Sequence, residues 1–235
     1  MTRKSSGFIV PALLAAVFCA VSGRAQVVKT AYPAMAPLEQ YMMPEAAEVA
    51  LARSAAPSSI SAKAKVIVLR RDGYATAADG GNGWVCVVER GWANATDAPD
   101  FWNPKLRGPI CFNPAASRSF LPIYLMKTRL VLAGERSKKA LVQATEAAFR
   151  SGKLPALEQG SMCYMMAKQQ YLGDRDKRWH PHLMFFAPVN ADKEWGANLP
   201  GSPVIAADDP EEHVTIFLIP VWHWSDGTPG PPLKN

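Results

Sequence analysis

KVIVLRRDGYATAADGGNGWVCVVE, residues 65–89, contains the best hairpin turn in the chain between runs that read as strands. An apolar, β-branched run at 65–71 leads into an Asp-Gly pair at 72–73, which is the strongest hairpin signal in the chain. A return strand fits 74–78, and a glycine-rich turn then leads into another apolar run at 84–89. The pattern predicts a β meander.

Outward from this stretch, the C-terminal third carries more strand signals. Short apolar runs occupy 161–167 and 183–187, and a longer run with β-branched residues occupies 214–222. The connections between them are rich in Gly, Pro and Asp, which favour turns. We expect these runs to extend the same sheet.

Helical signals fall in blocks. Pro44 suits the first turn of a helix that ends before Pro57, and apolar residues at helical spacing occupy 122–132. A second helix of a pair fits between Ser137 as N-cap and Gly152 as a left-handed stop. Strands and helices that do not alternate indicate an α+β fold. We therefore expect one domain: an antiparallel sheet with helices packed on one face and long Pro/Trp-rich loops.

The connection between Gly91 and Pro122 stands apart from these elements. Prolines recur through it, and it holds Trp92, Phe101 and Trp102. Long irregular connections in compact domains often bind ligands or form lids, although an unrecognised element is the alternative.

The N-terminus has the features of a secretory signal peptide over residues 1–25, with cleavage near Ala25. Its uncharged run at 8–21 is shorter than the roughly 20 residues of a membrane-spanning helix, so we expect no permanent membrane span. Lipidation at Cys19 is disfavoured because the preceding residue is the bulky Phe18. The sequence thus predicts a periplasmic or secreted protein.

Charge and domain organisation follow from this cleavage. The formal net charge of +6 falls to +3 once the three basic residues of the leader are removed. Lys and Arg are not clustered, so we expect no nucleic-acid partner. The remaining chain divides into an irregular segment with one helix at 26–60, the α+β domain at 61–228 and a flexible tail at 229–235.

Three cysteines remain after cleavage, namely Cys86, Cys111 and Cys163. In an oxidising compartment two of them are expected to pair. A Cys86–Cys111 bridge would attach the proline-rich loop to the core, and Cys163 then stays as a buried thiol. All three pairings are open at the level of sequence.

Several strings resemble an uncharacterised family of exported bacterial proteins, and the likeness covers most of the mature chain. The resemblance implies a bacterial origin and assigns no activity. The strings are Asn82-Gly83-Trp84-Val85-Cys86, Phe101-Trp102-Asn103-Pro104-Lys105, Tyr171-Leu172-Gly173-Asp174-Arg175, Trp179-His180-Pro181-His182 and His223-Trp224-Ser225-Asp226-Gly227.

Histidines supply one candidate site. His180 and His182 are two residues apart, so on a strand they project from one face, and His223 ends another predicted strand. Three imidazoles could hold a divalent transition metal such as zinc, copper or iron, for hydrolytic or redox chemistry. Ordinary structural or surface histidines are the alternative explanation, and His213 could replace any of the three.

Sulfur-containing residues supply another candidate, namely Met162, Cys163, Met165, Met166 and Met184. Thioether and thiolate groups could hold Cu(I), although ordinary core packing explains these residues better.

Aromatic residues in the long loop supply a further candidate. Trp92, Phe101 and Trp102 could form a platform for a sugar or another flat ligand, if their rings are exposed. No phosphate-binding loop, dinucleotide-binding turn or serine nucleophile elbow is present in the sequence. The sequence therefore indicates an exported envelope protein that binds a small molecule, a sugar or an envelope partner, or has a structural role. The alternative is a metal-dependent enzyme using His180, His182 and His223.

Overall fold

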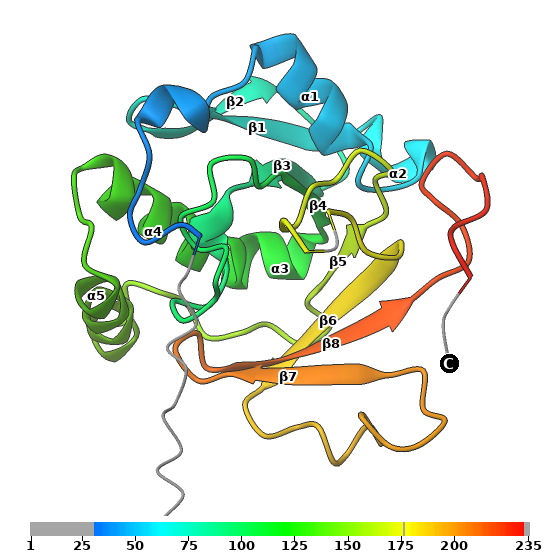
Figure 1. The fold of residues 1–235 in the computed structure, drawn as a ribbon. Helices are drawn as coiled ribbons and strands as arrows, with labels where there is room; N and C mark the ends of the chain where they lie inside the picture. The colour runs from blue at the N-terminus through cyan, green and yellow to red at the C-terminus, as the bar shows by residue number, and fades with distance from the viewer. Residues whose placement is uncertain (1–30, 176, 233–235) are drawn as a thin grey trace, which may run out of the picture.

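The computed structural model describes residues 31–175 and 177–232, so the expected signal peptide and the last three residues of the expected tail lie outside the described residues. The described chain is a single α+β domain around one mostly antiparallel sheet (Figure 1), which confirms the predicted fold class. The strands in chain order are β1 (Lys65–Arg70), β2 (Gly73–Ala78), β3 (Val85–Glu89), β4 (Gly108–Phe112), β5 (Met162–Met165), β6 (His182–Pro188), β7 (Ile205–Asp209) and β8 (Val214–Pro220).

The sheet has the order β2-β1-β3-β4-β5-β6-β8-β7, and every neighbouring pair is antiparallel except β1 and β3. The helices are α1 (Glu45–Arg53), α2 (Ser58–Ser61), α3 (Pro114–Ser119), α4 (Leu121–Leu132) and α5 (Lys138–Arg150), with 3-10 turns η1 (Leu38–Gln40) and η2 (Gly91–Ala93). No helix of the described part is both long and apolar enough to cross a membrane.

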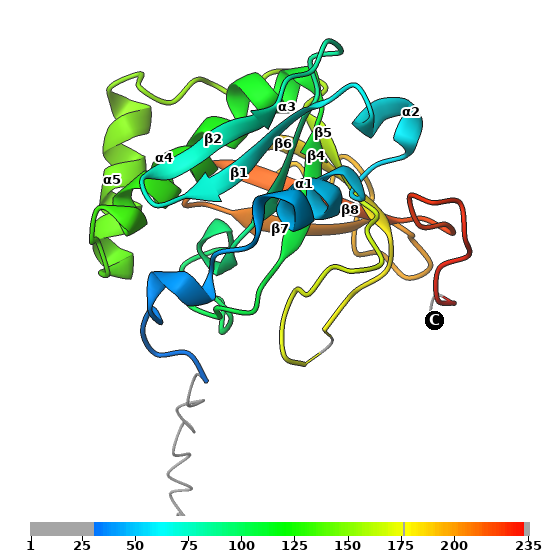
Figure 2. The same cartoon turned by 90° about the horizontal axis from the view of Figure 1, so that it is seen from above.

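The helices lie on both faces of the sheet (Figures 1 and 2), whereas the sequence suggested one. Side chains alternate along β1, so Val66 and Val68 pack with α1 while Ile67 and Leu69 join the larger core that includes α3, α4 and α5. The predicted helical pair, α4 and α5, shares one face. The N-terminal helix covers the other, because α1 contacts β1, β3 and β4.

Residues 65–89 form three strands, as predicted, but they are not a meander. β2 is an edge strand, and β3 instead runs parallel to β1 on its other side, with Lys65 opposite Val85. The chain therefore crosses past the start of β1 on its way to β3. At the crossing, a Cβ on Gly80 would lie 2.1 Å from the backbone nitrogen of Lys65, so only glycine fits there.

The long connection between Gly91 and Pro122 contains η2, β4 and α3, so the loop interpretation is wrong and the alternative of unrecognised elements is confirmed. β4 lies between β3 and β5 inside the sheet. Cys111 of β4 is directly opposite Cys86 of β3, and the two form a buried disulfide. This confirms the predicted pairing, and Cys163 is the buried free cysteine.

Two ladders of the sheet pair only two residues each, β1–β3 and β4–β5, and the second of these is called the β4–β5 joint below. β4 and β5 pair through Cys111–Tyr164 and Phe112–Cys163, whereas β6 and β8 pair over seven residues each. In Figure 1, β1 to β4 lie above this joint and β6, β8 and β7 lie below it. The candidate site spans the joint.

Candidate functional site

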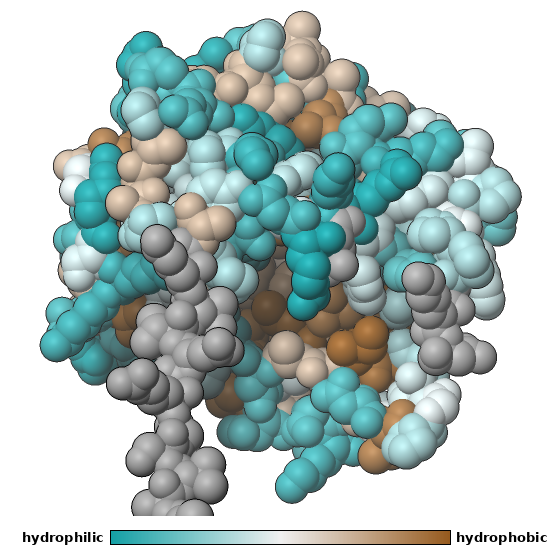
Figure 3. Space-filling model, in the orientation of Figure 1, coloured by the Kyte–Doolittle hydropathy of each residue, from teal (hydrophilic) through white to brown (hydrophobic). Residues whose placement is uncertain are grey.

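An apolar pocket of about 430 Å³ lies on the sheet face that carries α3 and α4. Figure 3 shows hydrophobic residues at the bottom of a hollow in front of β6 and β8. Its apolar walls come from both halves of the sheet and from the loops at its rim, and they include Leu106, Ile110, Phe120, Met165, Leu172, Met184, Phe186, Ile216 and Leu218.

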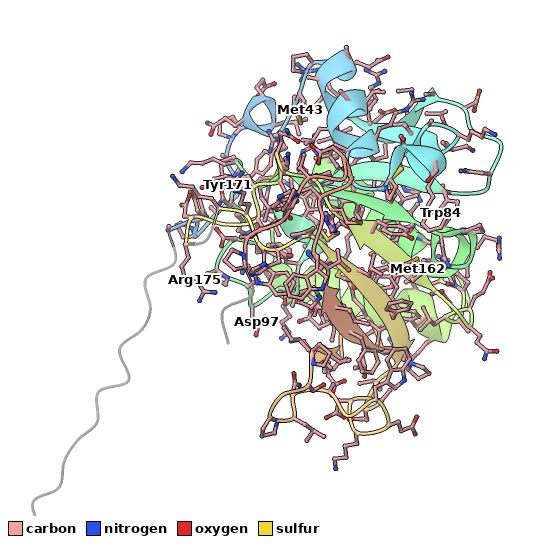
Figure 4. All side chains as sticks on the ribbon, turned by 90° about the vertical axis from the view of Figure 1, so that its right-hand side faces the viewer. Met43, Trp84, Asp97, Met162, Tyr171 and Arg175 are labelled. Atoms are coloured by element: carbon pink, nitrogen blue, oxygen red, sulfur yellow. A yellow bond between two sulfur atoms is a disulfide. The ribbon has the colours of Figure 1, made fainter. Side chains whose placement is uncertain are left out.

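Two loops form the rim of this pocket. Ala93 ends η2 and Asn94 and Ala95 follow it, and Leu172 and Trp179 belong to the connection between β5 and β6. In Figure 4 the labelled Asp97 and Arg175 mark these two loops, on the side of the molecule away from Trp84 and Met162.

Four acidic residues line the pocket, and three of them lie at the ends of strands and in the turn beside them. Glu89 follows Val85 and Val87 on the same face of β3, so strand alternation directs it into the pocket. Asp209 ends β7, and Glu212 lies in the turn that leads to β8. Both are buried.

The surroundings raise the pKa of two of these groups. Burial raises the pKa of Glu89 to about 8, the charge of Glu212 adds to this effect, and Lys127 opposes it. Burial and the Glu212 charge likewise raise the pKa of Asp209 to about 6. Burial in a cleft raises these pKa values because it favours the neutral form of a carboxyl group. Carboxyl groups with raised pKa values in a cleft are typical of functional sites.

Glu212 is the carboxylate that has a cationic partner. Lys127 of α4 donates to Glu212 Oε1 at 2.9 Å and to the carbonyl oxygen of Asn94 at 3.1 Å, and both ionic side chains are buried. A second link joins the same segments, because the hydroxyl of Thr96 donates to Glu211. These contacts fix the rim loop after η2 against the β7–β8 turn.

Arg90 also borders the pocket, and its guanidinium is already bound elsewhere. Nη2 donates to Glu48 Oε1 at 2.9 Å, Nε donates to the carbonyl oxygen of Tyr41 at 2.8 Å, and Nη1 donates to the carbonyl oxygen of Val88. Arg90 and Glu48 are both 0% exposed. This ion pair attaches α1 to the end of β3 and leaves the charge of Arg90 neutralised.

His182 is the histidine that reaches the pocket. Its Nδ1 lies 2.7 Å from the carbonyl oxygen of His180. A carbonyl only accepts, so Nδ1 carries the proton and Nε2 holds the lone pair in the neutral ring. Burial lowers the pKa of His182 to about 4, which keeps the ring neutral at physiological pH. The ring packs edge-on against Trp179, at 4.7 Å between centroids.

The other two predicted metal ligands do not line this pocket. His223 is exposed beyond the end of β8, and His180 Nδ1 is buried without a hydrogen-bond partner in the described structure. Across residues 31–175 and 177–232, no three His, Cys, Asp or Glu side chains are placed so that they could hold a metal ion. The histidine metal site therefore remains a prediction from spacing.

The predicted aromatic platform lies in the hydrophobic core. Trp92 and Phe101 are 0% exposed and Trp102 is 2% exposed. Trp92 Nε1 donates to Thr128 at 2.9 Å, and Trp102 accepts the Tyr41 hydroxyl through its carbonyl oxygen. Stacking on a ligand needs an open ring face, so these three residues serve packing and not binding.

The sulfur-containing residues also pack in the core. Met165 and Met184 form part of the pocket wall, and Cys163 is fully buried, with the pKa of its thiol raised by that burial. A thiol in this state is unreactive.

Sequence reasoning missed Glu89, Asp209 and Lys127. Glu89 had a usable signal, since it continues the alternation of Val85 and Val87 onto the core face. Asp209 had none, because its strand, Ile205–Asp209, is too polar to be recognised.

Comparisons with protein-family models, with curated proteins and with solved structures give no match to this chain. The resemblance to exported bacterial proteins therefore stays an expectation. The functional conclusion rests on the pocket and its side chains.

Proposed function

We propose that this chain is an exported cell-envelope protein that binds a small, largely apolar molecule in the pocket across the β4–β5 joint. The observation that carries the proposal is the open apolar hollow of about 430 Å³ with a few polar groups in its wall. Small-molecule sites typically have volumes of about 300–1,000 Å³ and this composition.

The lining limits the kinds of nucleophilic catalysis that the pocket could support. Among the described residues that line it there is no Ser, Thr, Cys, Tyr or Lys. A covalent intermediate would therefore have to form on a carboxylate or on His182. The disulfide Cys86–Cys111 supports the export part of the proposal, because such bridges persist in oxidising compartments.

The test is the binding of N-phenyl-1-naphthylamine, an uncharged dye that fluoresces in apolar surroundings. We expect saturable fluorescence with the native protein. Met184→Trp should abolish most of it, because Met184 lines the pocket and a larger side chain would fill the cavity.

Phe185→Trp is the matched control. Phe185 is the next residue of β6 and points to the other sheet face, where it lies 6.0 Å from Trp195 between ring centroids. Dye binding should survive this change. Equal binding by both variants, or no saturable binding by the native protein, would refute the proposed function.

A further inference from the structure

Most of the polar groups that line the pocket are hydrogen-bond acceptors. His182 is 2% exposed, its Nδ1–H is used by the His180 carbonyl, and its Nε2 has no partner in the described structure. The Glu89 side chain likewise makes no hydrogen bond or ion pair with any described residue. Neither acceptor is among the fully buried atoms that lack a partner, so both are open to the pocket, where a ligand that donates can reach them.

The charge balance of the pocket points the same way. Four of its lining residues are acidic, namely Glu89, Asp208, Asp209 and Glu212. Lys127 is held by Glu212, and Arg90 is held by Glu48. Asp208 accepts the Thr215 hydroxyl, and Asp209 accepts the backbone amide of Glu212, so neither has a cationic partner.

We propose that the ligand is a small amphipathic amine in its protonated form, whose ammonium group pairs with Glu89 and whose carbon skeleton lies on the apolar walls. An ammonium group supplies donors and no acceptor, which complements a carboxyl group that has no ion-pair partner. The inference rests on the proposed function, since it names the ligand class of the same pocket.

The carbon walls explain why an organic cation fits better than an inorganic one. Ile110, Phe186 and Leu218 offer apolar surface to a hydrocarbon body. In the described part of the chain no three metal-binding side chains converge, so the pocket lacks the ligand set of a metal ion.

Entry of the ammonium group is coupled to a proton. Burial and the charge of Glu212 raise the pKa of Glu89 to about 8 and so favour its neutral form, with Lys127 opposing. The other ionisable groups that interact with it are Tyr74, Tyr124 and Cys163, all held neutral by burial. The arriving cation favours ionised Glu89, so its carboxyl proton leaves to solvent as the ion pair forms.

The experiment displaces the bound dye with three molecules of similar size at pH 7.5: 2-phenylethylamine, 2-phenylethanol and 3-phenylpropanoate. We expect the amine to displace the dye at a concentration about tenfold or more below that of the alcohol, with the carboxylate weakest. Equal potency, or the carboxylate as the best competitor, would overturn the inference while leaving the proposed function intact. Absence of dye binding would instead refute the proposed function.

Glu89→Gln tests the residue that carries the preference. The ratio of amine to alcohol potency should fall to about threefold or less, and it is read within each variant, so a general loss of affinity does not affect it. Glu194→Gln removes the same charge from an exposed site and should keep the native ratio. A native ratio in Glu89→Gln would contradict the assignment.

A measurement on the native protein covers the case in which Glu89→Gln fails to fold. The amine-to-alcohol ratio should rise between pH 5.5 and 8, as Asp209 and then Glu89 ionise more readily. A ratio that does not change over this range would overturn the inference.

Discussion

Glu89 is an ionisable residue whose position is set by its strand and not by a partner. It occupies a core-facing position at the end of β3, where the pocket is apolar and Glu212 contributes a like charge. Ionisation of Glu89 is therefore unfavourable in the folded state only, because the unfolded chain exposes the carboxyl group to water. This makes the stability of the protein dependent on pH.

We predict that the native protein loses stability between pH 5 and 8 relative to Glu89→Gln. The folded pKa of about 8 is above the ordinary value of 4.5, so the unfolded chain ionises first and the stabilising contribution is lost as pH rises. Each pH unit in this window lowers the free energy of unfolding by up to about 1.4 kcal/mol. Urea denaturation at pH 5, 6.5 and 8 measures the effect.

Glu194→Gln is the control for this prediction, and its stability profile should run parallel to that of the native protein. A parallel profile for Glu89→Gln as well would show that Glu89 titrates normally in the fold.

Sequence alone identified some of the individual residues of the site. His182 was selected for its spacing from His180, and it does reach the pocket, but through a neutral ring fixed by a backbone carbonyl. The aromatic residues were misplaced because exposure depends on packing that a single sequence does not contain. Trp92, for example, is covered by α4 through its bond to Thr128.

Among the elements, β3 and β4 depend on a covalent link as well as on their ladder. Cys86 and Cys111 are directly opposite each other and are separated by 25 positions in the chain. Closing a loop of this length in the unfolded state removes chain entropy, which stabilises the fold by about 3 kcal/mol.

We predict that a thiol reductant lowers the free energy of unfolding by about that amount, as measured by urea denaturation with and without dithiothreitol. Cys163→Ala should keep this sensitivity, and the double variant Cys86→Ala, Cys111→Ala should lose it. Reductant sensitivity that persists in the double variant would contradict the assigned pairing.

The strands that carry strong β-branched patterns were all predicted from sequence, and so were α1, α4 and α5. β4 was missed because Gly108 and Pro109 resemble a turn, although Pro109 pairs with Val88 inside the sheet. The order of β1 to β3 was also beyond the sequence, since the hairpin signal at 72–73 fixes one pairing and not the position of the next strand. That position depends on the crossing at Gly80.

For the molecule as a whole, the expected leader determines where the pocket operates. We predict that expression of the full chain in a bacterium yields a product outside the cytoplasm that begins at Gln26, as shown by fractionation and N-terminal sequencing. Leu14→Arg interrupts the apolar run and should retain the intact chain in the cytoplasm.

Thr2→Arg adds the same charge before the apolar run and should leave export unchanged. Intact chain in the cytoplasm for the native sequence would rule out the leader.

The short β4–β5 joint has a thermodynamic consequence for the pocket that spans it. Glu89 and Ile110 belong to one half of the sheet, while His182 and Leu218 belong to the other. A ligand that contacts both halves would stabilise their packing, so we expect its binding and the stability of the β4–β5 pairing to be thermodynamically linked. Tyr164 pairs with Cys111 across this joint and does not line the pocket. We therefore expect substitutions of Tyr164 to change the affinity of the pocket for its ligand by weakening the β4–β5 pairing.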